Sequence, residues 1–230
     1  MTTPAHKIKL YTNHGCPWAH RAHIALAELN VPFGEEIVDL SVPRTREYLQ
    51  VNPRGLVPAM EFDGQVITES GIVAAFLADA YPSAGLSPPS TDPDGPLARA
   101  RVAFFVDTYF SKGLGHVLKS VSAWGMDPPP RSRPQPTSLP SSSRRSSPCS
   151  RTRRRSLGEQ QADFSRGSFL LRLYAYIKHG LMPASLGEDL AAKAPNFDKW
   201  AKATIAHPSV TCVWDEDRVI AHSKYRYGKK

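Results

Sequence analysis

Residues 11–21 read Tyr-Thr-Asn-His-Gly-Cys-Pro-Trp-Ala-His-Arg, and this stretch decides the fold of the first part of the chain. Before it, residues 7–11 alternate polar and apolar side chains, which is typical of a short strand. After it, apolar residues recur at helical spacing. Pro17 is favoured at the first position of a helix, because its missing N–H costs nothing there. The sequence therefore predicts a strand, a tight turn and a helix that begins near Pro17.

The turn places Cys16 beside the N-terminus of this helix. Unpaired backbone N–H groups and the positive end of the helix dipole favour a thiolate at such a position. Arg21 and the two histidines of the stretch, His14 and His20, are expected to add positive potential. Cys16 is therefore a candidate nucleophile. The alternative is that Cys16 is a small buried apolar residue that closes the turn.

The next segments predict the rest of a small α/β domain. Residues 33–40 read as a second strand, and the intervening helix makes a parallel pair with the first strand. A hairpin is predicted over residues 59–68, because Asp63-Gly64 separates two alternating runs. Ser70 is a good N-cap for the helix that follows. The order predicts a mixed four-stranded sheet.

An all-helical region is predicted to follow a linker rich in Pro, Ser, Asp and Gly. Its apolar residues recur at helical spacing over residues 102–121, 169–177 and 197–205. The predicted division is 1–83 for the α/β domain, 84–96 for the linker and 97–230 for the helical domain.

Residues 127–167 do not fit this helical pattern. Eight arginines and one acidic residue lie between residues 127 and 158, so this stretch carries most of the net charge of +8. Seven prolines interrupt it, and only Leu139 and Cys149 are plausible core residues in its first part. Too little apolar area is present to offset the entropy of ordering. We therefore expect a disordered, atypical insertion rich in Pro, Ser and Arg.

This segment allows two interpretations. One is a basic arm that binds nucleic acid or an acidic membrane, and the other is a non-functional insertion. The composition favours the second, so we do not expect a nucleic-acid partner. With clear helical pattern on both sides, the segment looks like translated non-coding or out-of-frame sequence. A continuous in-frame exon over these codons would contradict that hypothesis.

The remaining composition narrows the class of protein. The three cysteines, Cys16, Cys149 and Cys212, are too few for a disulfide framework and indicate a reducing compartment. Cys212 is expected to be a core residue. The first residues lack an apolar signal core, and no apolar run approaches a membrane span, so a cytoplasmic protein is expected. No Cys/His set has zinc spacing, and no metal is expected.

Three motifs in order resemble the glutathione transferase superfamily. They are Cys-Pro-Trp-Ala at 16–19, Asn-Pro-Arg-Gly-Leu-Val-Pro at 52–58, and Glu-Ser at 69–70, which follows the hairpin and opens a helix. The chain is similar to the cysteine-type, omega-like branch. The resemblance implies a thioredoxin-like N-terminal domain, a helical C-terminal domain, glutathione as cosubstrate at the seam between them, and a homodimer.

The resemblance also implies roles for single residues. A cis proline at Pro58 turns the backbone of Val57 toward the cysteinyl part of glutathione. Glu69 and Ser70 hold its γ-glutamyl end, and Arg44 faces its glycyl carboxylate. A substrate pocket is expected to be lined by Tyr11, Trp18 and His14, with Phe105, Tyr109 and Trp124 opposite. For each, a structural role is the alternative: a turn proline, a helix cap, a solvated arginine or core packing.

The expected chemistry is glutathione-dependent thiol transfer. The Cys16 thiolate attacks a glutathionylated thiol or similar electrophile, and a second glutathione releases the mixed disulfide. One alternative is conjugation of glutathione to a small electrophilic metabolite, with Cys16 only orienting the thiol. Another is a non-catalytic glutathione- or partner-binding module, inactive because of residues 127–167. Relatives have a helix and a polar cap there, for which residues 165–168 are a poor substitute.

Overall fold

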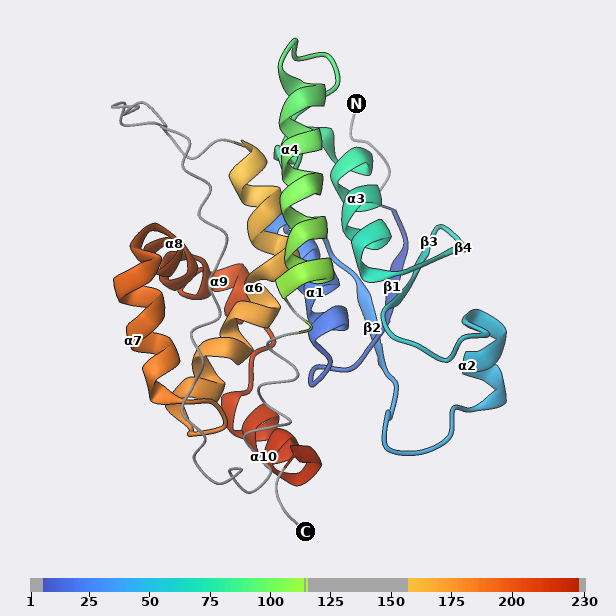
Figure 1. Ribbon diagram of the computed structural model, residues 1–230. Coiled ribbons are helices and arrows are strands. Elements are labelled where there is room, and N and C mark those ends of the chain that lie inside the picture. The colour runs from blue at the N-terminus through green and yellow to red at the C-terminus, as the bar shows by residue number, and fades with distance from the viewer. Residues whose placement is uncertain (1–5, 114, 116–156, 228–230) are drawn as a thin grey trace.

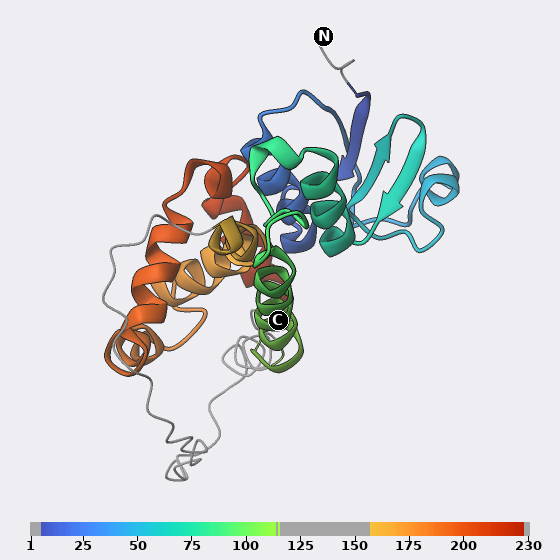
Figure 2. The same cartoon turned by 90° about the horizontal axis from the view of Figure 1, so that it is seen from above.

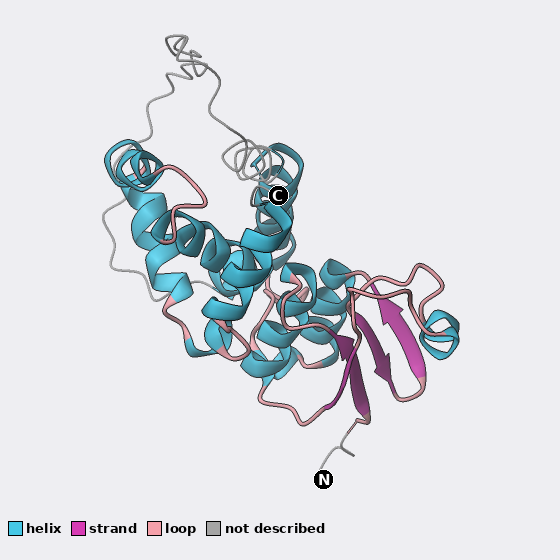
Figure 3. Ribbon diagram, turned by 90° about the horizontal axis from the view of Figure 1, so that it is seen from below, coloured by secondary structure: helices cyan, strands magenta, loops and turns pink. Residues whose placement is uncertain are grey.

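The computed structural model describes residues 6–113, 115 and 157–227 (Figure 1). The strands gather at one end of the molecule, and the remainder is helical (Figure 3). The first part contains β1 (Ile8–Thr12), α1 (Pro17–Leu29), β2 (Gly34–Ile37), α2 (Arg46–Val51), β3 (Ala59–Phe62), β4 (Gln65–Thr68), α3 (Ser70–Ala80) and the 3₁₀ turn η1 (Pro82–Ala84). The second contains α4 (Gly95–Thr108), the π-helical turn η2 (Tyr109–Gly113), α6 (Leu157–Lys178), α7 (Ala184–Lys193), α8 (Pro195–Ile205), α9 (Pro208–Thr211) and α10 (Glu216–Tyr227).

The four strands form one mixed sheet in the order β2-β1-β3-β4. β1 and β2 are parallel, as expected for two strands joined through α1. β3 is antiparallel to both β1 and β4. Asp63 and Gly64 form the hairpin turn with positive φ angles of 50° and 84°, the conformation that favours these residue types. The predicted topology is confirmed.

Helices lie on both sides of this sheet. α1 and α3 pack together, and α2 lies on the side opposite to them (Figures 1 and 2). The core on the α1 side contains Leu10, Leu26, Met60 and Leu77, all buried. Burial of an aliphatic side chain of this size stabilises the fold by about 1.5–3 kcal/mol. The α1 end nearest Cys16 is therefore fixed to a well-packed layer.

α6 is the central helix of the second part, and it packs against α1, α4 and α8. Gly167 makes the close approach possible. A Cβ atom there would lie 2.9 Å from both methyl carbons of Val210 and 3.5 Å from Cδ1 of Ile24. Ile24 and Val210 belong to a buried cluster that joins α1 to the helical part. The helical part thus touches the helix that carries the cysteine turn.

The observed helices differ from the expected ones at three places. α6 begins at Leu157, so the irregular segment does not extend to Gly167. Residues 157–164 contain no proline and several good helix formers, which explains this. Residues 165–168 lie inside α6 and do not cap it. α7 and α10 were not predicted. Residues 116–156 fall outside the described part, so disorder there stays a prediction.

Among the described residues, no helix combines the length and the apolar character that crossing a bilayer needs.

Candidate active site

The turn between β1 and α1 holds Cys16 at the N-cap of α1, with Pro17 as the first helical residue. The Cys16 amide donates to the carbonyl of Asn13 over 2.9 Å. The Asn13 side chain fixes the turn from both sides: its amide donates to Val38 O over 2.9 Å, and its oxygen accepts from the Gly15 amide over 3.0 Å. The predicted start of the helix is confirmed, and Cys16 is a free cysteine of intermediate burial.

Arg172 from α6 reaches this turn from the helical part. Its guanidinium donates to Gly15 O over 2.9 Å and to Ser168 O over 2.7 Å. Burial lowers the pKa of Arg172 to about 10, so the side chain stays charged at pH 7. A buried cation therefore lies one residue from Cys16. Sequence reasoning missed it, although Arg172 is the charged residue within the apolar run 169–177, where a charge is unusual.

Val57 and Pro58 lie on the other side of the cysteine. The Cys16 Sγ lies 4.0 Å from the carbonyl oxygen of Val57. The peptide bond between Val57 and Pro58 is cis. The loop before it is tied down by the Tyr48 hydroxyl and the Asn52 amide, which both donate to Leu56 O. The structure thus brings together the first two motifs that the sequence analysis singled out.

Glu69 and Ser70 open α3, but the helix begins one residue earlier than the prediction of a Ser70 cap. Glu69 is the N-cap residue and Ser70 the first helical residue, which corrects the predicted cap by one position. Glu69 has a φ of 68°, an unfavourable backbone conformation for a glutamate that tends to occur at functional sites. Its carboxylate pairs with Arg54. Glu69 is therefore held in an unusual backbone conformation and paired with Arg54.

Arg21 of α1 contacts the first residue of α3. Its guanidinium donates to the Ser70 hydroxyl over 2.9 Å, and both side chains are buried. Burial lowers the pKa of Arg21 to about 10, so its positive charge persists at neutral pH. The sequence had suggested that Arg21 acts near Cys16. Its charge instead adds to the helix dipole at Ser70, which makes the α3 N-terminus attractive to a carboxylate.

Arg44 is held by the loop that carries it. Its guanidinium donates to four backbone carbonyls, which belong to Asp39, Leu40, Val42 and Gly55. This bonding orders the segment between β2 and the 52–58 motif. Contact with a glycyl carboxylate stays a prediction for this residue.

Aromatic rings form a wall next to Cys16. Trp18 lies 5.0 Å from Phe110 and 4.8 Å from Phe169, measured between ring centroids. The sequence had proposed Phe105 and Tyr109 for this wall. Phe105 instead stacks under Arg166, 3.5 Å from its guanidinium, inside the helical part. The helical part supplies Phe110 and Phe169 to this wall, and the predicted Tyr109 lies 5.3 Å from Phe110. Trp124 lies outside the described residues.

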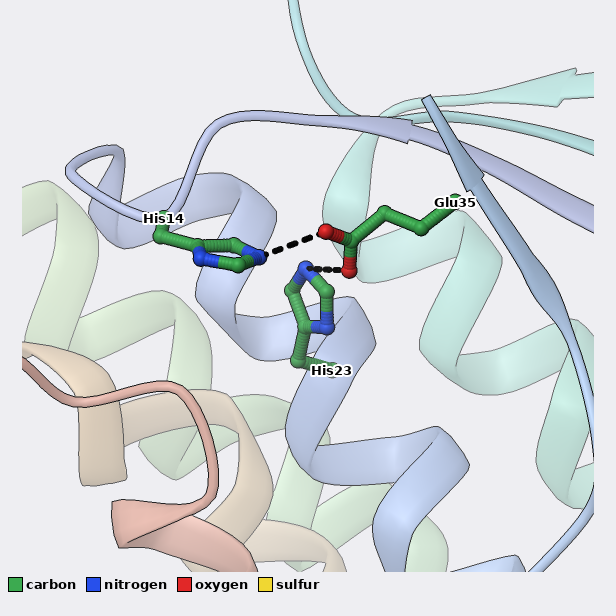
Figure 4. A group of neighbouring side chains, drawn as sticks. All are labelled: His14, His23 and Glu35. Carbon is green, nitrogen blue, oxygen red and sulfur yellow. Dashed lines mark hydrogen bonds and ion pairs between the residues drawn. The ribbon is translucent and has the colours of Figure 1, made fainter. Parts of the chain in front are cut away.

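The histidines do not act as the sequence suggested. His20 is buried and stacks on Trp214, and burial together with Arg172 lowers its pKa to about 3. It is neutral at pH 7 and adds no positive potential at Cys16. His14 points to Glu35, with 2.7 Å between Nε2 and Oε1, rather than toward the aromatic wall (Figure 4). The buried His23 lies beside His14, with its Nε2 atom 3.7 Å from the other carboxylate oxygen, Oε2.

Cys212 follows α9 and does not belong to the β1–α1 turn. Cys212 is exposed, which contradicts the expected core position. α9 ends at Thr211 and uses Ser209 and Val210 as its buried residues, so Cys212 falls on the outer side. Cys149 lies outside the described residues. Of the described cysteines, Cys16 is the one that lies at a helix N-terminus next to a buried cation.

Comparison with known proteins agrees with this geometry. Residues 15–80 match the family model "Glutathione S-transferase, N-terminal domain". The chain is 36% identical over 87 residues to glutathione transferase omega-1 of Caenorhabditis elegans, and 30% identical over 108 residues to glutathione S-transferase omega-1 of Mus musculus. These matches cover 37% and 46% of this chain, and 33% and 42% of the relatives, so less than half of each relative is matched.

The resemblance of the fold extends further than that of the sequence. The crystal structure of glutathione transferase Omega 1C from Trametes versicolor superposes with a TM-score of 0.72 at 25% identity, and the match covers 96% of both chains. A thioredoxin-like domain followed by a helical domain is therefore confirmed. Residues 15–80 thus match a glutathione transferase N-terminal domain, and the relatives together with the whole-chain fold support the glutathione transferase superfamily, on its omega-like branch.

Proposed function

We propose that this chain is a glutathione transferase that uses Cys16 for glutathione-dependent thiol transfer. The observation that carries the proposal is the placement of the Cys16 thiol: at the N-terminus of α1, 4.0 Å from the Val57 carbonyl, with Arg172 bound to the preceding residue. Helix N-termini and neighbouring cations favour the thiolate, which is the nucleophilic form. The omega-class relatives, which are glutathione transferases, support glutathione-dependent activity.

The proposed reaction has two displacement steps. The Cys16 thiolate attacks the glutathione sulfur of a mixed disulfide between glutathione and another thiol. The S–S bond of the substrate breaks, its other thiol leaves as a thiolate, and a Cys16–glutathione disulfide forms. The thiolate of a second glutathione then attacks this disulfide, which yields oxidised glutathione and returns Cys16 to its thiolate. No net oxidant is needed, because each step exchanges one thiolate for another.

Glutathione is proposed to lie between Cys16 and the start of α3. The backbone of Val57, presented by the cis Pro58, would pair with the cysteinyl residue. Ser70, whose hydroxyl accepts a hydrogen bond from the positively charged Arg21, would bind the γ-glutamyl carboxylate. Glu69 would face the ammonium group.

The outer parts of the ligand site are proposed from the same layout. Arg44 would face the glycyl carboxylate from the 39–44 loop. Trp18, with Phe110 and Phe169, offers an apolar surface on the side of Cys16 that faces the helical part. This surface would take the organic part of an electrophilic or disulfide substrate. The proposed molecule is a cytoplasmic homodimer divided at residues 1–83, 84–96 and 97–230.

Conjugation is the second candidate. The apolar wall suits an electrophilic metabolite as well as a disulfide, and Cys16 could then orient the glutathione thiol without a covalent step. A non-catalytic glutathione-binding module is the third candidate, in which the unusual residues 127–167 leave the site inactive.

The three candidates separate in a paired activity assay. The full chain is assayed for reduction of a glutathione–mercaptoethanol mixed disulfide and, in parallel, for conjugation of glutathione to a chlorinated nitrobenzene. Thiol transfer predicts activity in the first assay that falls at least a hundredfold in Cys16→Ser and is unchanged in Cys212→Ser. Conjugation that survives Cys16→Ser, without thiol transfer in the parent chain, would favour the second candidate. Glutathione binding without either activity would favour the third.

A further inference from the structure

The cluster of His14, His23 and Glu35 has no part in the proposed reaction. The three residues come from the β1–α1 turn, the middle of α1 and β2, and they are far apart in the sequence. Figure 4 shows the two imidazole rings next to each other, each with a nitrogen facing one oxygen of the Glu35 carboxylate. The Nε2 atom of His14 lies 2.7 Å from Oε1, and the Nε2 atom of His23 lies 3.7 Å from Oε2. Both rings therefore direct a nitrogen at one carboxylate.

We propose that His14, His23 and Glu35 bind a divalent cation of the zinc type. One ligand atom from each residue lies within 4.8 Å of the other two. Ligands bound to a tetrahedral zinc ion at about 2.0–2.1 Å are separated from each other by about 3.4 Å. The observed separations of 2.7 and 3.7 Å fall on both sides of that value. Small movements of the partly exposed side chains of His14 and Glu35 would therefore complete the site.

The donor set selects the class of cation. Two imidazoles and one carboxylate are typical zinc ligands, and imidazole also suits other late transition metals. Magnesium and calcium prefer oxygen ligands, so they fit this set poorly. The hydroxyl of Thr12 lies 2.8 Å from His23 Nε2 and is a further oxygen on the inner side. Three protein ligands leave a fourth position for water or another small ligand.

The three ligands differ in burial, which gives the site one fixed ligand and two that an ion can reach from solvent. The side chain of His23 is 1% exposed, whereas those of His14 and Glu35 are 32% and 28% exposed. His23 is therefore held by the core, and the two outer ligands can adjust as the ion enters. Because the His23 side chain is already held in place, it loses little conformational entropy when the ion binds. No spacing rule predicts this site, because the residues have no zinc spacing and meet only through the parallel pairing of β1 and β2.

Calorimetric titration with ZnCl₂ tests the site. The parent for the test is the full chain with Cys16→Ser, Cys149→Ser and Cys212→Ser, because thiolates also bind zinc. The expected result is one equivalent of Zn²⁺ bound, at least tenfold weaker binding in His14→Gln and in Glu35→Gln, and no binding of Mg²⁺. Both substituted side chains are partly exposed, and far-UV circular dichroism confirms that each variant is folded.

The chain offers a matched control. His179 and Glu216 form a similar pair, 2.7 Å apart, at the surface between α6 and α10. His179→Gln is expected to leave zinc binding unchanged. The proposal is overturned if the parent binds no zinc, if His14→Gln and Glu35→Gln bind as tightly as the parent, or if His179→Gln weakens binding equally. Because the parent lacks Cys16, the result is independent of the proposed thiol transfer.

Discussion

Arg172 in α6 donates a hydrogen bond of 2.9 Å to the carbonyl of Gly15, the residue before Cys16. The two residues belong to different halves of the chain, so this bond ties the helical part to the cysteine turn. The guanidinium also donates to Ser168 O and lies 5.1 Å from the ring of Trp214. The reactivity of Cys16 is therefore expected to depend on a residue of the helical part.

Replacing Arg172 by Met removes the charge and keeps most of the side-chain volume. We expect slower alkylation of Cys16 by iodoacetamide at pH 7, because the cation that favours the thiolate is gone. We also expect a loss of about 2 kcal/mol in the free energy of unfolding, since hydrogen bonds from a charged group are lost. Peptide mapping after timed labelling measures the first effect. The exposed Arg218→Met is the control, and equal alkylation rates in both variants would contradict the role of Arg172.

Gly167→Ala tests the contact between α6 and its neighbours. The added Cβ would lie 2.9 Å from both methyl carbons of Val210, so a side chain or helix must move. We expect a destabilisation of about 1–3 kcal/mol, measured by urea unfolding. Gly187→Ala in α7 is the matched control, because its Cβ would lie at an ordinary 3.5 Å from Ile177. There the higher helix propensity of alanine predicts equal or greater stability. Similar effects of both substitutions would contradict the close packing at Gly167.

We expect the chain to lose stability in mild acid because His20 is buried in its neutral form. Its pKa is lowered to about 3 in the folded chain by burial and by the charge of Arg172, with His23 and His14 nearby. The unfolded chain binds a proton near pH 6.5, and the folded chain does not. The stability that the neutral His20 contributes is thus fully present above pH 6.5 and is lost as the pH falls toward 3. Each pH unit in this window costs about 1.4 kcal/mol per histidine proton.

The check is the free energy of unfolding between pH 7 and pH 5.5, where most carboxylates remain ionised. His20→Gln should make the decline shallower, because glutamine does not titrate. Part of the decline remains, since burial also lowers the pKa of His23, to about 4. His222→Gln, at an exposed position of α10, should leave it unchanged. An equally steep decline in the parent chain and in His20→Gln would show that His20 is not the source.

Local signals predicted most of the α/β domain. Pro17 after Cys16 marked the start of α1, and Asp63-Gly64 marked the hairpin, because both depend on conformational preferences of neighbouring residues. The motif residues Cys16 and Val57 meet in the fold as expected. Helix boundaries were less accurate: α6 begins at Leu157, twelve residues before the predicted apolar run 169–177, since the composition there changes from Arg and Ser to helix formers.

Long-range contacts could not be predicted in the same way. The bonds from Arg172 to Gly15 and from Arg21 to Ser70 join residues 157 and 49 positions apart, and no spacing rule covers them. The aromatic wall was expected from the apolar stripe of α4, but the orientation of that helix turns Phe105 toward Arg166 and leaves Phe110 beside Trp18. Helix packing angles decide such choices, and a periodic pattern does not contain them.

The most direct test of the central claim is the mass of the intact chain after incubation with oxidised glutathione, followed by peptide mapping. A reactive Cys16 predicts one added glutathione on the peptide that contains Cys16, its removal by reduced glutathione, and far less labelling of Cys212. Cys16→Ser should abolish the addition. A folded chain whose Cys16 remains unmodified, or is labelled no faster than Cys212, would contradict thiol transfer through this residue.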